Sequence, residues 1–332
     1  MNTNINVGVV GVGHLGALHA KMYAQIPQAH FVGVYDVNQD RCREIAALYN
    51  VRAFESMDEL LASVDALSIA TVTTHHYETA RRALEAGRHV LIEKPITATI
   101  AEARELNEIA KAKGLLIQVG HIERFNPAIL SLEEYKLAPM FIESHRLSQF
   151  NPRGTDVAVV LDLMIHDIDI ILSLVQSPVT KIEATGVSVV SETADIANAR
   201  LVFANGCVAN VTASRISQKK MRKMRMFQSN AYISIDFLQG QSEVFRLVDP
   251  ADPTADATMM LGEIERGKKK RKITYEHLEQ KEVNALESEL QSFLNAIAAG
   301  TRPIVSGEDG QHALEVAQEI MKLIQVLHYG EE

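Results

Sequence analysis

Ionisable side chains share one face of a segment that is otherwise almost entirely apolar. Asp162, His166 and Asp169 recur at i, i+4 and i+7 within Asp156–Leu174, which predicts a helix carrying them in one stripe. Such an apolar helix is normally buried, and a buried carboxylate or imidazole is costly unless it is paired or used. An imidazole beside carboxylates can transfer protons, so the stripe is a candidate catalytic face. The alternative is a core helix whose polar groups satisfy one another.

A second candidate group is Glu93-Lys94-Pro95, which directly follows a predicted buried strand at His89–Ile92. The carboxyl ends of strands are where doubly wound sheets bind ligands. Proline fixes the direction of the chain there, so the lysine could bind a substrate hydroxyl and help to transfer its proton. The alternative is a solvated pair of charges on the surface.

A glycine-rich turn near the N-terminus predicts a dinucleotide site. It reads Gly-Val-Gly-His-Leu-Gly and lies between a predicted strand, Ile5–Val10, and a helix. In this pattern Gly11 permits a tight turn, Gly13 lets the backbone approach a pyrophosphate, and Gly16 allows close packing. The helix N-terminus offers N–H groups to phosphates. The expected cofactor contacts are Gly11, Val12, Gly13, His14, Leu15 and Gly16.

The carboxylate of Asp36 indicates which dinucleotide is bound. It ends a second predicted strand, His30–Tyr35, and lies 20 residues after Gly16, where an acidic side chain binds the adenosine ribose hydroxyls. A carboxylate there would repel a 2′-phosphate, so we expect NAD rather than NADP. The alternative is an ordinary turn residue after a strand.

Strand–helix alternation over residues 1–120 predicts an α/β fold, a doubly wound parallel sheet of the Rossmann type. One strand, Ala66–Thr71, ends at the ligand-binding edge, which makes Thr71 and the nearby His76 further candidates for cofactor contact. The remaining expected strands are Ala53-Phe54 and Leu115–Val119, and the expected helices are Arg41–Tyr49, one opening at Ser56, His75–Ala86 and Thr99–Lys113.

Beyond Pro127 the alternation ends, and residues 121–332 predict an α+β second domain with an open, mostly antiparallel sheet. Gly206 marks a hairpin turn. We expect the last helix to return toward the first domain. The expected strands are Phe141–Gln149, Lys181–Val190, Ala197–Phe203, Cys207–Ser214, Arg222–Gln228 and Ala231–Phe237, and the closing helices are Ala285–Ala299 and Gly310–Leu327.

Composition limits the classes of partner. The 332 residues carry a net charge of −9, which argues against nucleic acid and anionic membrane surfaces. The basic run Gly267–Lys272 is predicted to be a solvated loop, the alternatives being a nucleic-acid contact or a contact with nucleotide-sugar phosphates. Two cysteines without ligand spacing, and no visible secretion signal, predict a cytoplasmic protein without a metal. The ionisable residues of the apolar helix argue against a membrane span.

Together these motifs resemble the glucose–fructose oxidoreductase/inositol dehydrogenase/MocA (Gfo/Idh/MocA) family of NAD(P)-dependent sugar dehydrogenases, over nearly the whole chain. The family's catalytic signature is the lysine of E-K-P plus an Asp and a His four residues apart, which implies catalytic roles for Lys94, Asp162 and His166. The resemblance rests on GVGHLG with Asp36, on Glu93-Lys94-Pro95, on Val119-Gly120-His121 followed by Arg124-Phe125-Asn126-Pro127, on Asp162, His166 and Asp169, and on Ser306–Gly310.

The resemblance also implies the remaining contacts. The segments VGHIERFNP and LDLMIHDIDI look most like members that oxidise UDP-N-acetylglucosamine at C3. The family covers the exposed face of its second-domain sheet by pairing subunits, which implies a homodimer or homotetramer. The implied cofactor contacts include His76, Glu93, Lys94 and His121, and the implied substrate contacts are Lys94, Arg124, Asn126, Arg153, Asp162 and His166. One departure is Val72-Thr73, where the family usually has Pro-Asn.

The expected reaction oxidises a sugar hydroxyl to a ketone by hydride transfer to NAD. His166 is the better proton acceptor because an imidazole titrates near neutrality, Lys94 would stabilise the alkoxide, and Asp162 would bond a hydroxyl or tune His166. Which of Lys94 and His166 takes the proton stays open. The alternative functions are a dehydrogenase of a free polyol such as myo-inositol, and a non-catalytic dinucleotide sensor.

Overall fold

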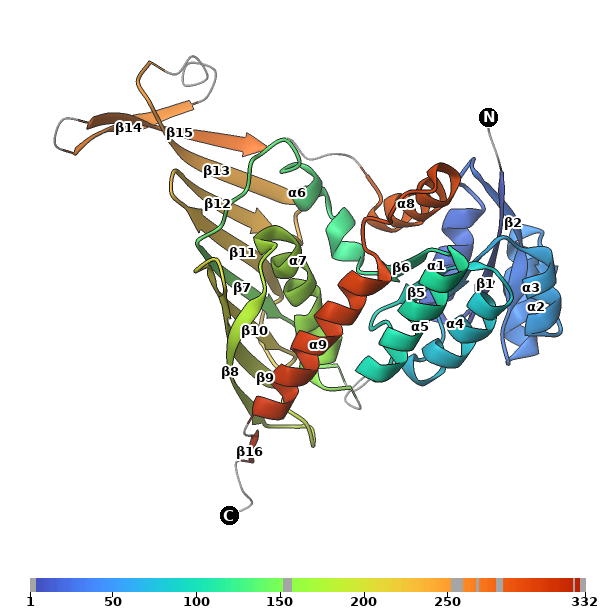
Figure 1. Ribbon diagram of the computed structural model, residues 1–332. Helices are drawn as coiled ribbons and strands as arrows, with labels where there is room; N and C mark the ends of the chain where they lie inside the picture. The colour runs from blue at the N-terminus through green and yellow to red at the C-terminus, as the bar shows by residue number, and fades with distance from the viewer. Residues whose placement is uncertain are drawn as a thin grey trace. The chain divides into compact units, whose positions relative to one another are not determined.

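The computed structural model describes residues 4–151, 157–251, 259–266, 269–278, 283–324 and 326–328, and the chain divides into two compact units (Figure 1). The first unit comprises Met1–Phe125 with Val283–Glu315, and the second comprises Asn126–Glu282 with Val316–Glu332. The expected first domain, residues 1–120, lies within the first unit, and a later segment of the chain also belongs to that unit.

The first unit is built on a parallel sheet in the order β3-β2-β1-β4-β5-β6. The order reverses between β1 and β4, and in open α/β sheets such a switch point is where ligands bind. This arrangement confirms the predicted doubly wound sheet. The strands are β1 (Ile5–Val10), β2 (Ala29–Tyr35), β3 (Arg52–Ala53), β4 (Ala66–Ile69), β5 (His89–Glu93) and β6 (Ile117–Gly120).

Local capping explains where the helices of this unit begin and end. The Asn38 side chain accepts a hydrogen bond from the Arg41 backbone at the start of α2. Thr99 and Glu102 form a reciprocal capping box at the start of α5, which stops at Gly114 with φ 65°. The helices are α1 (His14–Tyr23), α2 (Gln39–Tyr49), α3 (Met57–Ser63), η1 (Thr73–His75), α4 (His76–Glu85), α5 (Ile100–Lys113) and η2 (Ile122–Phe125).

Helix α8 (Ala285–Ala299) belongs to the core of the first unit. Its buried residues Leu290, Phe293 and Leu294 share one apolar cluster with Tyr23 and residues of β1. The Gln118 side chain of β6 also donates to the Glu289 carbonyl of α8 at 2.8 Å. Helix α9 (Gly307–Leu323) begins in the first unit, and its residues after Glu315 belong to the second unit. Burial of its apolar face therefore stabilises α8 in the first unit, although α8 is distant from that unit in the sequence.

The second unit is built on a mixed sheet in the order β14-β15-β13-β12-β11-β7-β10-β9-β8-β16. Neighbouring strands are antiparallel except for two parallel pairs, β7 with β10 and β8 with β16. The mostly antiparallel sheet is thereby confirmed. The strands are β7 (Phe141–Leu147), β8 (Val179–Ser188), β9 (Ile196–Phe203), β10 (Val208–Ser214), β11 (Met221–Gln228), β12 (Ala231–Asp236), β13 (Gln241–Val248), β14 (Met259–Arg266), β15 (Lys269–Leu278) and β16 (Val326–His328).

One prediction for this unit was wrong. Of the expected loop Gly267–Lys272, the part from Lys269 onward is the start of β15, whereas Gly267 and Lys268 lie outside the described residues. In the hairpin with β14, Lys272 pairs with Glu263 and Lys270 with Glu265. Opposite charges directly across a strand pair stabilise it, so the run is compatible with a sheet.

The predicted central helix is shorter than expected and begins irregularly. Val160–Met164 form one π-helical turn, which continues as α7 (Ile165–Val175), and Asp156 lies outside the described residues. Helix α7 contacts β7 and β10, and the short α6 (Pro127–Leu130) contacts β12 and β13 (Figure 1). Alternate side chains of β7 and β10 are buried, and the others lie on the opposite, open face of the sheet.

Candidate functional site

The glycine-rich turn between β1 and α1 forms an open cradle. Gly11 has φ +81°, a conformation that favours glycine, and a Cβ on Gly16 would lie 1.7 Å from the Gly11 carbonyl oxygen. Glycine at both positions therefore lets α1 pack against the turn. A Cβ on Gly13, by contrast, would meet no atom within 4 Å. The open main chain at Gly13, beside the N-terminus of α1, fits the pyrophosphate of a dinucleotide.

The Asp36 carboxylate closes the same turn. One oxygen accepts a hydrogen bond from the Val12 backbone at 2.7 Å, and the other accepts from the Asn38 backbone at 2.8 Å. Arg41, which the sequence analysis did not single out, donates from Nε to the Val12 carbonyl at 3.0 Å. Asp36 is half-buried, so its oxygens can accept further bonds from ribose hydroxyls. The arrangement fits the adenosine end of NAD.

The remaining residues of the turn and the end of β4 differ in accessibility. His14 and Leu15 begin α1 with exposed side chains. Thr71 is half-buried, and its hydroxyl oxygen makes no hydrogen bond within the part of the chain that the structure describes. A buried hydroxyl without a partner is a candidate for bonding a ligand. Cofactor contact by these three residues stays a prediction.

His76 braces two strand-end segments. Its Nδ1 lies 2.9 Å from the Pro95 carbonyl oxygen and its Nε2 lies 3.0 Å from the Thr71 carbonyl oxygen. The ring is buried, which lowers the pKa of His76, while the two carbonyl contacts act in the opposite direction. With both nitrogens engaged by main chain, His76 holds the ends of β4 and β5 together. Its expected contact with the cofactor stays a prediction.

The segment Glu93-Lys94-Pro95 leaves β5 beside a buried histidine. Glu93 Oε1 is hydrogen bonded to Nε2 of His19 at 2.8 Å, and His19 Nδ1 is hydrogen bonded to Ser68 Oγ at 2.8 Å. Neither His19 nor Ser68 was predicted from the sequence as a site residue. The signal for each was a single polar residue within an apolar stretch, on the buried side of α1 and in the middle of β4.

The end of β6 supplies the next predicted residues. His121 is buried directly after the strand, and Arg124 lies half-buried in η2. Asn126, the first residue of the second unit, accepts from the Ala128 backbone as the N-cap of α6 and donates to the Phe237 carbonyl at 3.1 Å. Asn126 thus has a structural role, and substrate contact by these residues stays a prediction. Arg153 lies outside the described residues.

The predicted catalytic stripe begins on the π-helical turn. Asp162 lies within Val160–Met164, and His166 lies in the first turn of α7. Both side chains are half-buried, whereas Asp169 is buried. A π-helical turn is wider than an α-helical one, so the stripe is not the regular one that the spacing predicted, and such turns occur frequently at functional sites.

Asp167, which lay outside that stripe, is explained by a buried ion pair that the sequence analysis missed. Arg146 of β7 donates from Nε and Nη2 to the two oxygens of Asp167 at 2.8 and 3.0 Å. The guanidinium also lies over the Phe237 ring, 5.7 Å from its centroid. The pair attaches the helix that carries His166 to the sheet, by a bidentate geometry with two charge-assisted bonds.

Comparison with known proteins identifies the family from both units. Residues 5–121 match the model of the oxidoreductase family with an NAD-binding Rossmann fold, and residues 139–234 match the GFO/IDH/MocA C-terminal domain. The chain belongs to the Gfo/Idh/MocA oxidoreductase family. This confirms the resemblance seen in the sequence, and with the cradle described above it identifies an NAD-dependent oxidoreductase.

Relatives of this Gfo/Idh/MocA protein include a UDP-N-acetylglucosamine 3-dehydrogenase from Acidithiobacillus ferrooxidans, 38% identical over 318 residues and 96% of each chain. A solved structure of that enzyme has a TM-score of 0.86 at 37% identity, covering 97% of this chain and 98% of its own. A myo-inositol 2-dehydrogenase from Thermotoga maritima is 26% identical over 328 residues, 93% of each chain. The similarity to all three runs through both units.

Membrane-spanning helices and metal-binding clusters are both absent from the described residues of this family member. No helix among them combines the length and the apolar character that a membrane span requires. No group of three or more His, Cys, Asp or Glu side chains among them is arranged to hold a metal ion.

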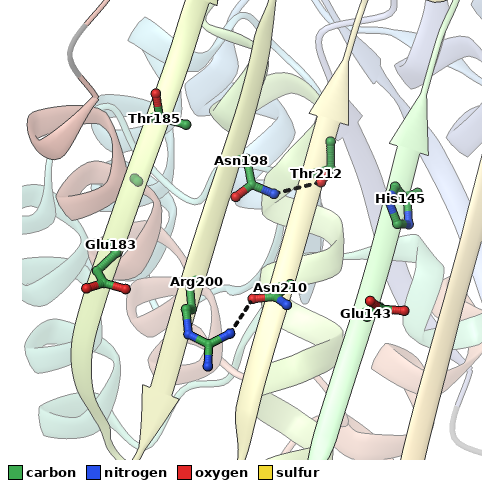
Figure 2. A pocket seen from close by; sticks show the side chains of 9 residues that line it. Glu143, His145, Glu183, Thr185, Asn198, Arg200, Asn210 and Thr212 are labelled. Carbon is green, nitrogen blue, oxygen red and sulfur yellow. Dashed lines mark hydrogen bonds between the residues drawn. The ribbon is translucent and has the colours of Figure 1, made fainter.

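A hollow of about 500 Å³ lies on the open face of the second-unit sheet, and none of its lining residues is a predicted site residue. Figure 2 shows that Asn198 donates to Thr212 and that Arg200 donates to Asn210. The donor–acceptor distances of these two hydrogen bonds are 2.8 and 3.1 Å. Beside it a row of aromatic rings crosses five strands, with centroids 4.9–5.9 Å apart. The hollow is lined by Glu143, His145, Glu183, Ala184, Thr185, Asn198, Arg200, Asn210 and Thr212, and the rings are Phe141, Phe227, Tyr232, Phe245 and Tyr275.

Proposed function

We propose that this enzyme oxidises the C3 hydroxyl of UDP-N-acetylglucosamine to a ketone. The observation that carries the proposal is the 38% identity to the Acidithiobacillus ferrooxidans enzyme over 96% of each chain. That similarity extends through the second unit, which contains Asp162 and His166. The alignment with the myo-inositol 2-dehydrogenase covers a similar share of each chain, 93%, but with only 26% identity. A nucleotide-sugar is therefore better supported than a polyol as the substrate class.

The chain would hold NAD at the turn Gly11–Gly16 and at Asp36, and NAD bound there supplies the acceptor for the hydride that leaves the sugar carbon. The residues of the chain must manage the hydroxyl proton and the charge that develops on oxygen. His166 accepts the proton, because an imidazole titrates near neutrality. The Lys94 ammonium donates a hydrogen bond to the developing alkoxide, and Asp162 bonds a substrate hydroxyl or orients His166.

A panel of substrates tests the assignment through the absorbance of NADH. UDP-N-acetylglucosamine should reduce NAD with a kcat/KM far above that of free N-acetylglucosamine, UDP-glucose or myo-inositol. Free N-acetylglucosamine tests the need for the nucleotide, and UDP-glucose tests the need for the acetamido group. A preference for myo-inositol would support the polyol alternative. Tight NADH binding without turnover of any sugar would support the sensor.

Single substitutions test the catalytic roles. Lys94→Ala and His166→Ala should each lower turnover by about 10²-fold or more while NADH still binds, because each removes one part of the proton transfer. Lys111→Ala and His277→Ala, at exposed positions of α5 and β15, are the matched controls and should leave turnover unchanged. Near-normal turnover in either test variant rejects the role of that residue.

We further propose that a second copy of the chain covers the open face of the second-unit sheet, in a homodimer or homotetramer. The aromatic row and the polar hollow together offer an apolar band beside groups that can form hydrogen bonds, the mixture found in subunit interfaces. Phe227→Glu places a charge in the middle of the row and should reduce the mass in solution to that of a monomer, measured by light scattering. A monomeric parent protein would contradict the assembly.

The two cysteines suit the cytoplasm, which we propose as the location of the enzyme. Cys42 and Cys207 are both buried and neither forms a disulfide, and thiols persist in reducing compartments.

A further inference from the structure

We propose that His19 is a positioning residue for Lys94 and that it acts through the Glu93 carboxylate. The inference rests on the proposed catalytic role of Lys94. It assigns a task to a side chain on the helix of the dinucleotide turn, far from Lys94 in the sequence. Each contact that carries the inference lies within the first unit.

The buried contacts leave the His19 ring a single orientation. Nε2 is hydrogen bonded to Glu93 Oε1 and Nδ1 to Ser68 Oγ, each at 2.8 Å. His19 and Ser68 are 0% exposed and Glu93 is 8% exposed, so water does not compete for these bonds. The three residues come from α1, β4 and β5, which are neighbours in the fold. Because both ring nitrogens are engaged, a rotation of the imidazole would break two buried hydrogen bonds.

The second oxygen of the carboxylate reaches the residue that carries the amine. Glu93 Oε2 accepts a hydrogen bond from the Lys94 backbone N–H at 3.3 Å. The side chain is confined on its other side by Gly120, where an added Cβ would lie 2.9 Å from Oε2. The carboxylate therefore folds back along its own chain and bonds the next peptide group. The orientation of that peptide determines where the Lys94 side chain starts.

The protonation states are consistent with this role. Burial opposes ionisation of Glu93, but the hydrogen bond from His19 and the nearby charges of His19 and Lys94 outweigh it and hold the pKa of Glu93 below its ordinary value. An ionised carboxylate only accepts hydrogen bonds, so His19 donates from Nε2. The Ser68 hydroxyl can donate to Nδ1 or accept from it, so this contact does not oppose the bond to Glu93.

The pair connects the cofactor turn with the proposed catalytic lysine. His19 lies in α1, whose N-terminus directly follows the glycine cradle, so a shift of that helix is transmitted to Glu93. On the other side of Lys94, His76 holds the Pro95 carbonyl at 2.9 Å. The main chain is thus fixed on both sides of Lys94. A misplacement of about 1 Å can cost on the order of 10²-fold in rate, so this fixing has a kinetic consequence.

The test compares variants of the intact enzyme by steady-state kinetics with UDP-N-acetylglucosamine and NAD. His19→Phe keeps a ring but removes both hydrogen bonds, and it should lower kcat about 10- to 100-fold while KM for NAD changes less than about 3-fold. His19→Gln can still donate to Glu93 and should recover most of the lost kcat. Met22→Ala, at another buried position of the same helix, controls for lost stability.

The outcomes separate this inference from the proposed function. The positioning role is supported if kcat falls in His19→Phe and recovers in His19→Gln. In that case Met22→Ala, compared at a matched melting temperature, should show no fall in kcat. If Lys94→Ala is inactive but His19→Phe has the same kcat as Met22→Ala, the positioning role is overturned while the proposed function stands. The same holds if His19→Gln has a kcat as low as that of His19→Phe. If Lys94→Ala retains turnover, the proposed catalytic role of Lys94 falls and the inference with it, whereas a parent enzyme without turnover of UDP-N-acetylglucosamine would overturn the proposed function. Should His19→Phe fail to fold, His19→Ala, which also loses the Glu93 bond, takes its place. Ser68→Ala keeps that bond and should leave kcat unchanged, so an equal fall in kcat in both variants would overturn the positioning role.

Discussion

Replacing Arg146 with methionine should destabilise the second unit by about 3–5 kcal/mol. Methionine fills much of the volume of the arginine stem but leaves the Asp167 carboxylate buried beneath α7 without its cation. In the parent protein both side chains of this pair are only 2% exposed, and two N–H groups bond the two oxygens at 2.8 and 3.0 Å. The substitution therefore tests whether this pair attaches α7 to the sheet.

The magnitude follows from the two bonds. A hydrogen bond to a charged group contributes about 1.5–3 kcal/mol, so two of them amount to roughly 3–6 kcal/mol. That range agrees with the cost of about 3–5 kcal/mol for removing one partner of a buried pair. Since a domain is stable by only about 5–15 kcal/mol, the loss would be a large part of the total.

Urea unfolding followed by circular dichroism measures the change. The double variant Arg146→Met with Asp167→Leu removes both charges and should recover most of the lost stability, because a packed apolar pair can replace a buried ion pair at little cost. The matched control is Lys181→Met in β8 of the same sheet. Lys181 pairs with Glu183, and these side chains are 63% and 54% exposed, so its loss should cost no more than about 1 kcal/mol.

Two results would refute this reasoning. A cost for Arg146→Met as small as that of Lys181→Met would mean that the buried pair does not hold the helix. A double variant less stable than Arg146→Met would mean that the carboxylate has other partners that stabilise it without the arginine.

Three further predictions concern the first unit. Gly16→Ala should lower the melting temperature and abolish NADH binding, because the added Cβ would lie 1.7 Å from the Gly11 carbonyl oxygen. Gly13→Ala should weaken NADH binding without a change in melting temperature, because its Cβ would meet no protein atom within 4 Å. Equal destabilisation by the two substitutions would contradict the proposed cradle. Asp36→Ala should lower the preference for NAD over NADP by about 10-fold or more, from the loss of charged hydrogen bonds, and unchanged relative kcat/KM values for the two cofactors would reject the ribose contact. Because the folded state holds the pKa of Glu93 below its ordinary value, the ionised carboxylate contributes stability at neutral pH that is lost as pH falls through the folded pKa. The stability difference between the parent and Glu93→Gln, measured in urea at a series of pH values, should therefore shrink on acidification, and a difference that grows would contradict the pairing.

Features set by neighbouring residues could be predicted from the sequence. The glycine turn and Asp36 were found because a strand, a tight turn and a helix N-terminus depend on residues a few positions apart. The capping box of Thr99 and Glu102 and the stop at Gly114 were found for the same reason. Strand-like runs in the sequence likewise predicted the strands from β7 to β12 of the second sheet. These signals need no knowledge of what lies opposite them in the fold.

Contacts between distant parts of the chain were missed or misjudged. The His19–Glu93 bond joins residues 74 positions apart. Helix α8 was expected to close the second domain and return toward the first, whereas its Phe293 packs in the core of the first unit. Apolar periodicity indicates which face of a helix is buried, but it does not indicate against which partner.

The sequence by itself determined the dinucleotide fold, the cradle of glycines and the family motifs, because each depends on short-range geometry or on residue identity. Only the tertiary structure decided that Asp167 pairs with Arg146, that basic residues from Lys269 onward form a strand opposite glutamates, and that two buried histidines hold the segment around Lys94. The physical reason is that a charge or an imidazole is stable in the interior only beside a partner, and the fold, rather than the spacing along the chain, supplies that partner.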